Sequence, residues 1–310
     1  MSDILYAFWD FHAGTPPLDL PLFLAAAEHA RRQGGHERCH VVLCDRSAGE
    51  TGGDPPWDEE AEWRLWNEVV PTLWLLPSGQ CFSLCRDAGE VADLADLAGA
   101  DAFPIPYGGP DLSACHPSRT GLFQPRDLAE APLRATLQAR DYVRQWLERR
   151  NDGRMVVTLS PAAMAGGDGT DGWAREWAAF AARLDRDRIL PVLLPAAADA
   201  HRPPGAVWET VPLYAEAAWN AELRLALYEM SDLLLVEDPF GAGLALFGAE
   251  TRCAAFGDTA DRLAALFPEA CAAEAVRRPF RGPCDAGALA AAYEQLAGTL
   301  ALPPLRPPSP

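Results

Sequence analysis

A loop close to the N-terminus holds three side chains that can accept or donate a proton. Asp10, His12 and Asp19 follow the apolar run that ends at Trp9, and a helix-like run begins directly after them. Carboxylates and imidazoles are the side chains that most often act as general bases in enzymes. Asp19 also occupies the position of a helix N-cap, which is an equally good interpretation of that residue. The loop is therefore a candidate catalytic segment with a structural alternative.

A second loop combines glycine and aspartate at the entrance of a helix. It runs over Ser160–Gly172, and the helix after it contains Arg175. The free N–H groups at such a glycine-rich entrance can hold an anion. Asp168 and Asp171 would repel a phosphate there, so an ordinary loop is the alternative interpretation.

The segment 217–247 contains the densest set of candidate ligand-binding residues. It is predicted to form an amphipathic helix, a buried strand, an acidic turn with two glycines and the start of another helix. Asn220 and Arg224 are four residues apart, so they share one face of the first helix. The turn contributes Glu237, Asp238, Gly241 and Gly243. In the alternative interpretation Arg224 is a surface residue paired with an acid, and the glycines serve packing.

These loops need a scaffold, and strand-like runs alternate with helix-like runs along almost the whole chain. Such alternation predicts an α/β protein with two doubly wound, Rossmann-like domains. Ligands bind at the carboxyl ends of strands in open parallel sheets, so the loops after the strands are the expected binding segments. The loops of most interest come after Trp9, Leu159, Leu194 and Glu237.

The expected strands are Ile4–Trp9, His40–Asp45, Cys81–Cys85 and Ala102–Ile105 in the first half, and Met155–Leu159, Ile189–Leu194, Leu233–Glu237 and Arg252–Phe256 in the second. The expected helices are Leu20–Gln33, Trp57–Val69, Ala88–Ala98, about 135–150, Trp173–Leu184, Tyr214–Glu229, one from about Gly243, and one from the cap Asp285 to about Leu300. A proline-rich stretch between residues 104 and 135 shows little periodicity and predicts the seam between the two domains.

The expected division is an N-terminal domain over 1–120, a C-terminal domain over 135–284, a last helix over 285–300 and a disordered proline-rich tail over 301–310. Disorder is the simplest expectation for a short terminal segment in which proline prevents a helix.

The composition excludes several classes of protein. The 310 residues include 26 Arg and no Lys, which excludes Walker phosphate loops, kinase-type ATP sites and lysine Schiff-base enzymes. The net charge of −18 disfavours nucleic acid and anionic lipid as partners. No apolar run is long enough to span a membrane, and Asp3 and Asp10 interrupt any secretory signal, so a soluble cytoplasmic protein is expected.

Eight cysteines occur without a C-x-x-C pair, and they are expected to be reduced core residues. The densest set of potential metal ligands is His36, Cys39, His40 and Cys44. The run 39–44 fits a buried strand better than a ligand loop, so no metal site is expected.

The second half of the chain resembles a known family. The order of helix, strand "DLLLVED", turn "PFGAG", helix "LALFGA" and strand "TRCAAFGD" resembles the C-terminal domain of GT-B glycosyltransferases of the heptosyltransferase type. In that family a strand ends in Asp-Ser/Thr-Gly, and the sugar nucleotide sits on the following helix. The loop ending in Asp19-Leu20-Pro21 is similar to the family's first loop, whose Asp is thought to act as base. Asn220, Arg224 and Tyr228 also match the N-x-x-x-R-x-x-x-Y pattern of bacterial glycosyltransferase-like proteins of surface-polysaccharide loci.

The resemblance implies a GT-B-like arrangement of two domains facing a cleft, with the last helix packing back toward the N-terminal domain. It implies transfer of a sugar, without a metal or other cofactor, from a nucleotide-sugar on the C-terminal domain to a glycan or other acceptor on the N-terminal domain. The base would be Asp19, with Asp10 and His12 as alternatives. The donor-binding candidates are Ser160, Arg175, Asn220, Arg224, Glu237, Asp238, Gly241 and Gly243.

The chain departs from the family pattern at three positions. Pro239-Phe240 replaces the Ser/Thr-Gly pair, Gly243 stands at the histidine position, and Ser160 stands where a Lys or Arg is expected. Two alternatives therefore stay open: a catalytically degenerate binding or assembly module on the same scaffold, and a nucleotide-sugar epimerase. The sequence specifies neither the sugar nor the acceptor, and it does not specify the oligomeric state.

Overall fold

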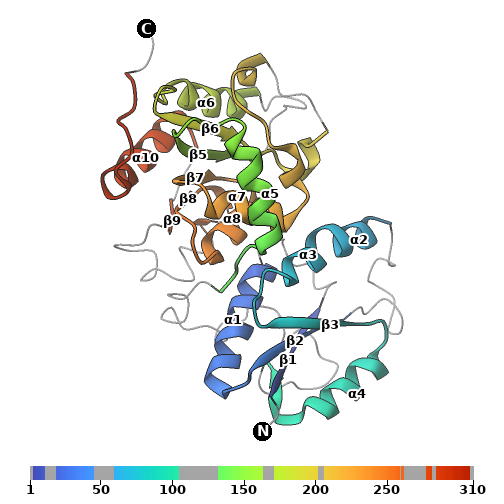
Figure 1. Cartoon of the computed structure of the whole chain (residues 1–310). Coiled ribbons are helices and arrows are strands. Elements are labelled where there is room, and N and C mark those ends of the chain that lie inside the picture. The colour runs from blue at the N-terminus through green and yellow to red at the C-terminus, as the bar shows by residue number, and fades with distance from the viewer. Residues whose placement is uncertain are drawn as a thin grey trace. The chain divides into compact units, whose positions relative to one another are not determined.

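The computed structural model (Figure 1) describes residues 3–10, 19–44, 59–104, 132–162, 171–201, 206–258, 260–261, 277–280 and 284–307. The chain divides into two compact units, Met1–Arg134 and Ala135–Pro310. Each unit is built on its own parallel sheet with helical connections. The predicted α/β class with two doubly wound units is therefore confirmed. Among the described residues, no helix combines the length and the apolar character that crossing a membrane requires.

The N-terminal sheet has the strand order β3-β2-β1-β4. Its strands are β1 (Ile4–Asp10), β2 (Arg38–Cys44), β3 (Gly79–Cys85) and β4 (Ala102–Phe103), and all neighbouring strands are parallel. Because β2 and β4 flank β1 on opposite sides, the strand order reverses between β1 and β4. Such a reversal is the point at which doubly wound sheets bind ligands.

The helices of this unit are α1 (Asp19–Gly34), α2 (Glu59–Arg64), α3 (Val70–Leu73) and α4 (Ala88–Ala98). The second predicted helix differs in its bounds, because a π-helical turn over Leu65–Val69 joins α2 to α3 and carries the helix four residues beyond Val69. The start and end of α4 agree with the prediction, and Asp87 caps it by accepting the backbone N–H of Glu90 at 2.9 Å.

The C-terminal sheet has the order β6-β5-β7-β8-β9. Its strands are β5 (Met155–Ser160), β6 (Ile189–Leu193), β7 (Leu233–Val236), β8 (Cys253–Ala255) and β9 (Arg277–Pro279). All neighbouring pairs are parallel. The four residues of β7 are Leu-Leu-Leu-Val and are completely buried, as in a strand covered on both faces. The last strand, β9, is not among the predicted strands, because its short run contains two arginines and a proline.

The helices of the C-terminal unit are α5 (Leu137–Glu148), α6 (Asp171–Ala182), α7 (Ala221–Glu229), α8 (Pro239–Phe247) and α10 (Ala286–Leu300). The helix predicted from Tyr214 begins at Ala221 instead, because Ala215–Ala218 forms a separate 3-10 turn and Asn220 caps α7. Helix α8 begins at Pro239, four residues before the predicted start, since proline fits the first turn of a helix.

The last helix begins at its predicted cap, where Asp285 accepts the backbone N–H of Ala288 at 2.7 Å. Helix α10 packs against α6 within the C-terminal unit (Figure 1). Leu289, Tyr293 and Leu296 are buried in the same apolar core as Phe180 of α6. The apolar face of α10 thus contributes to the core of its own unit, and its packing toward the N-terminal domain stays a prediction.

The segment 301–307 differs from the predicted disordered tail. Leu302 is buried, and the hydroxyl of Tyr293 donates to the carbonyl oxygen of Pro303 at 2.7 Å. The backbone N–H of Arg306 donates to the carbonyl of Arg183 at 2.8 Å, and its guanidinium forms an ion pair with Asp185 at 2.5 Å. Proline prevents a helix here but does not prevent an extended segment from packing.

Candidate functional site

The strand order of the C-terminal sheet places one candidate ligand site at the carboxyl ends of β5 and β7. These neighbouring strands are flanked by β6 on one side and β8 on the other, so the order reverses between them, as in other doubly wound sheets that bind ligands at this point. Ser160 ends β5, and Glu237 and Asp238 come directly after β7. The backbone N–H groups of both acids donate to the Ser160 carbonyl, at 2.9 and 3.3 Å. The predicted strand-end residues therefore come together.

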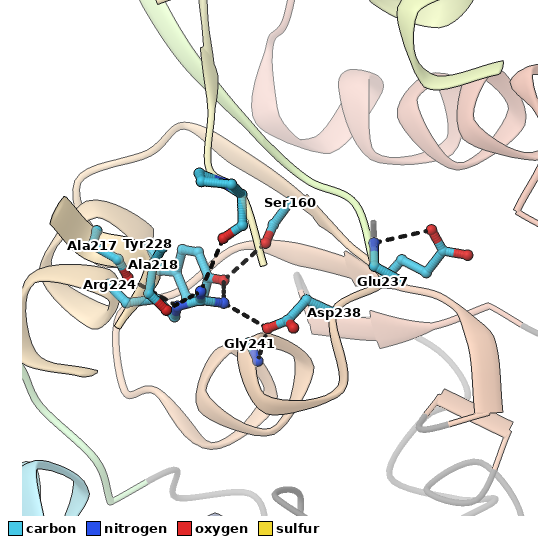
Figure 2. A network of polar contacts seen from close by, with 10 residues as sticks. Ser160, Ala217, Ala218, Arg224, Tyr228, Glu237, Asp238 and Gly241 are labelled. Atoms are coloured by element: carbon cyan, nitrogen blue, oxygen red, sulfur yellow. Dashed lines mark hydrogen bonds and ion pairs between the residues drawn. The ribbon is translucent and has the colours of Figure 1, made fainter. Parts of the chain in front are cut away.

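Arg224 lies at the centre of a buried polar network beside these strand ends (Figure 2). Only 1% of the residue is exposed. A guanidinium has five N–H groups, and here they donate to the carbonyls of Ala217 (3.1 Å), Ala218 (2.7 Å) and Pro195 (3.2 Å), to Asp238 Oδ2 (2.5 Å) and to the Tyr228 hydroxyl (3.5 Å). Every donor of Arg224 is thus used within the chain, and none is left to contact a phosphate.

Asp238 and Gly241 complete this network at the start of α8. Asp238 is the N-cap, and its Oδ2 accepts the N–H of Gly241 at 2.6 Å. The N–H of Ala242 donates to the Asp238 carbonyl at 2.8 Å, and Pro239 has no N–H to offer. The amide of Gly241 therefore caps the helix and is not free to bind the donor, for which Gly241 is a predicted contact. Gly243 is buried within the same helix.

The same network leaves little space for a side chain at position 241, which is glycine. A Cβ at Gly241 would lie 2.8 Å from Asp238 Oδ2 and 2.9 Å from Arg224 Nη1, and it would also meet the Tyr228 hydroxyl. These distances are shorter than real Cβ contacts, so a larger residue would force the network to shift. The packing interpretation of this glycine is the one that the structure supports.

The spacing Asn220, Arg224, Tyr228 is explained by the contacts of α7. Asn220 caps the helix by accepting the N–H of Leu223 at 2.9 Å, and Tyr228 donates its hydroxyl to Ser160 Oγ at 3.3 Å. Burial raises the pKa of Tyr228, although the Arg224 charge opposes this, so the hydroxyl stays protonated and can donate. Asn220 thus starts α7, whereas Arg224 joins the helix to Asp238 at the start of α8, and Tyr228 joins it to the end of β5.

Glu237 lies on the other side of the strand end. Figure 2 shows its side chain pointing away from Arg224 and Asp238. Its Oε2 accepts the indole N–H of Trp177 at 3.1 Å and the backbone N–H of Ala162 at 3.3 Å. Among the described residues, no donor reaches Oε1, although only 7% of the residue is exposed. This oxygen can accept a hydrogen bond from a ligand.

Burial raises the pKa of the Glu237 carboxyl, and the two hydrogen bonds to Oε2 lower it, with burial the larger effect. A carboxyl with a raised pKa at the end of a central strand is typical of functional sites, although structural networks also perturb pKa values. Trp177 and Ala162 are not among the predicted site residues. A tryptophan in an apolar helical run gives no sign, in sequence alone, that its N–H faces a strand end.

Of the remaining predicted site residues, only Arg175 has a described side chain. Arg175 is exposed on α6. Asp10 ends β1, next to the reversal point of the N-terminal sheet, and Asp19 is the first residue of α1. The side chains of Asp10 and Asp19, and the whole of His12, lie outside the described residues. The catalytic base therefore stays a prediction.

Comparison with known proteins gives distant structural likenesses. No protein-family model matches the chain, and no curated protein matches it. The glycosyl transferase family 9 structure from Veillonella parvula DSM 2008 is 11% identical, with a TM-score of 0.48 and coverage of 96% of each chain. The E. coli ADP-heptose LPS heptosyltransferase II is 13% identical, with a TM-score of 0.41 and coverage of 82% of this chain and 84% of that one. Neither likeness assigns an activity or a substrate to this chain.

Proposed function

We propose that the C-terminal unit binds a nucleotide-sugar at the carboxyl ends of β5 and β7, and that the protein transfers the sugar to a glycan or other acceptor without a metal. The observation that carries the proposal is the buried Glu237 carboxyl, which has one oxygen without a partner among the described residues at this strand-order reversal. A carboxylate oxygen at this position suits a ligand hydroxyl, and sugars and ribose offer adjacent hydroxyls. The sequence resemblance to GT-B glycosyltransferases supports the same ligand class.

In the proposed mechanism the base removes the proton of an acceptor hydroxyl. The acceptor oxygen then bonds to the anomeric carbon, and the nucleoside diphosphate leaves with the electron pair of the broken bond. Asp19, Asp10 and His12 are the candidates for the base. Glu237 would hold the donor, while Trp177 and Ala162 fix the position of its carboxyl. Of the two arginines among the predicted donor-binding residues, Arg224 is saturated within the chain, so Arg175 is the candidate to stabilise the departing diphosphate.

A binding module that does not catalyse transfer is the second candidate. The specific observation in its favour is that Arg224 and the Gly241 amide, two groups suited to a diphosphate, are both satisfied within the chain. Because these donors are occupied, they cannot stabilise a leaving diphosphate. Ligand hydroxyls could still bind to Glu237, which is not part of that network.

A panel of nucleotide-sugars tests the proposal, with thermal shift and release of nucleoside diphosphate measured on the same samples. A shift with product release supports transfer, and a shift alone supports the binding module. If the donor is converted to an epimer in the absence of an acceptor, the protein is an epimerase and not a transferase. If no nucleotide-sugar shifts the unfolding temperature, the proposed ligand class is wrong.

Alanine variants at Asp19, Asp10 and His12 then identify the base. Loss of the true base is expected to lower kcat by roughly 10²–10⁴ while donor binding is kept. Asp93→Ala is the matched control, because this exposed carboxylate of α4 lies in the same unit as the three candidates and is not a predicted site residue. Equal turnover in all three base variants would contradict a catalytic role for this loop.

A further inference from the structure

A cysteine, a histidine and a serine meet on neighbouring strands of the N-terminal sheet. Cys81 Sγ lies 3.1 Å from His40 Nδ1, and His40 Nε2 lies 2.9 Å from Ser83 Oγ. The ring of Tyr6 stacks on the imidazole with 5.3 Å between the ring centroids. None of these residues takes part in the proposed nucleotide-sugar site, so the chemistry of this cluster is independent of the proposed function.

An irregularity in β3 produces this arrangement. Cys39 pairs with Gly79, but the next residue of β2, His40, pairs with Cys81, so β3 contains one extra residue at this point. Extra residues of this kind redirect the side chains of a strand. Without it, His40 would face Gln80, and Cys81 would lie one position further along β3.

The three side chains satisfy the geometry of an activated nucleophile. A thiol within hydrogen-bond reach of a base, with the base oriented by a third group, is the arrangement found in nucleophilic catalysis and in reactive thiols. Burial lowers the pKa of His40, so the imidazole is neutral near pH 7 and can accept a proton at Nδ1. In that tautomer Nε2–H donates to Ser83 Oγ.

Cys81 differs in access from the other cysteines that the structure describes. It is exposed, whereas Cys39, Cys44, Cys85, Cys253 and Cys284 are buried. Burial raises the pKa of Cys39 to about 12 and that of Cys85 to about 11, so both stay protonated thiols. Cys81 thus combines solvent access with a neighbouring base.

We propose that Cys81 is a reactive thiol that forms a mixed disulfide with low-molecular-weight disulfides, with His40 as its base and Ser83 orienting the imidazole. The Sγ–H proton passes to His40 Nδ1 while Sγ bonds to one sulfur of the disulfide. The bond between the two reagent sulfurs breaks, and the second sulfur leaves as a thiolate, which then takes up a proton. The Cys81 sulfur is oxidised and the leaving sulfur is reduced, so electrons and atoms balance.

The test is the rate at which each cysteine of the folded full-length chain reacts with dithiodipyridine, an uncharged disulfide, with the modified peptides identified by mass spectrometry. An ordinary thiol with a pKa near 8.5 slows by about fifty-fold between about pH 8.5 and about pH 6.5, because its thiolate fraction falls. Cys81 is expected to slow by less than about five-fold, because neutral His40 accepts the proton over this range. Tyr6 stacks on the imidazole of the pair, Ser83 forms a hydrogen bond with it, and the buried Cys39, whose pKa is raised, interacts electrostatically with Cys81.

His40→Gln should restore the fifty-fold dependence of an ordinary thiol, and Ser83→Ala should restore part of it. His29→Gln is the matched control, because it removes a histidine from the same unit without touching Cys81, and it should leave the profile unchanged. Cys81→Ser should remove the fast-reacting peptide. The proposal is wrong if wild-type Cys81 shows the ordinary profile, a result that needs no variant to fold, or if folded His40→Gln keeps the wild-type profile.

Discussion

Glu237 and Asp238 are neighbours in the sequence, yet their side chains leave the end of β7 in opposite directions and meet different partners. The Asp238 carboxylate is held by Arg224 and by the N–H of Gly241. Glu237 is held at one oxygen by Trp177 and Ala162, and its other oxygen has no partner among the described residues. Because side chains alternate along a strand, two adjacent acids at its end can divide structural and ligand-binding roles.

The largest expected change in stability comes from replacing Arg224, which contacts Asp238 but not Glu237. Arg224→Ala removes the ion-pair partner of the buried Asp238 carboxylate and leaves several carbonyls without a donor, so it should lower the free energy of unfolding by about 3–5 kcal/mol. Urea unfolding measures this, with Arg175→Ala as the exposed arginine control, expected to change it by less than about 0.5 kcal/mol. Unchanged stability of Arg224→Ala, together with lost nucleotide-sugar binding, would instead make Arg224 a ligand contact.

A smaller effect is expected from Gly241→Ala. Its Cβ would clash with Asp238 and Arg224, and overpacking of this kind costs about 1–3 kcal/mol. Gly298→Ala is the matched control, since a Cβ there meets nothing within 4 Å in helix α10, and alanine should stabilise that helix by about 0.5–1 kcal/mol. The two variants should therefore move the unfolding midpoint in urea in opposite directions. If both move it upward, the tight packing at Gly241 is wrong.

The pH dependence of stability should single out Glu237. Its pKa is raised in the folded state, so the carboxyl contributes its stability at low pH and loses that contribution as the pH rises through the folded-state pKa. Glu237→Gln removes this loss. The free energy of unfolding of the variant, minus that of the wild type, should therefore increase between about pH 4 and about pH 7.

Glu250→Gln serves as the matched control for this titration, because Glu250 is a half-exposed carboxylate of the same unit. Its difference from the wild type gives the baseline for replacing a carboxyl of this unit by an amide. A Glu237→Gln difference that is constant with pH would show that the carboxyl does not titrate in the folded protein above its unfolded value.

The scaffold could be predicted from the sequence, but the different roles of Glu237 and Asp238 could not. The apolar run of β7, the cap at Asp285 and the alternation of elements follow from local residue patterns, and the structure confirms them. The partners of Arg224 include carbonyls of Pro195, Ala217 and Ala218, which lie in irregular segments. Backbone carbonyls carry no residue-specific signal, so an arginine that they saturate looks, in sequence, like one that binds phosphate.

We propose that Glu237 contacts a nucleotide-sugar, whereas Asp238 supports the fold. Calorimetric titration of the best nucleotide-sugar from the panel into wild type, Glu237→Gln and Glu250→Gln tests it most directly. Loss of a hydrogen bond to a charged group costs about 1.5–3 kcal/mol, so Glu237→Gln should weaken binding by roughly 10- to 100-fold, and Glu250→Gln should not change it. A Glu237→Gln variant that is folded and binds the nucleotide-sugar as tightly as the wild type would contradict the account.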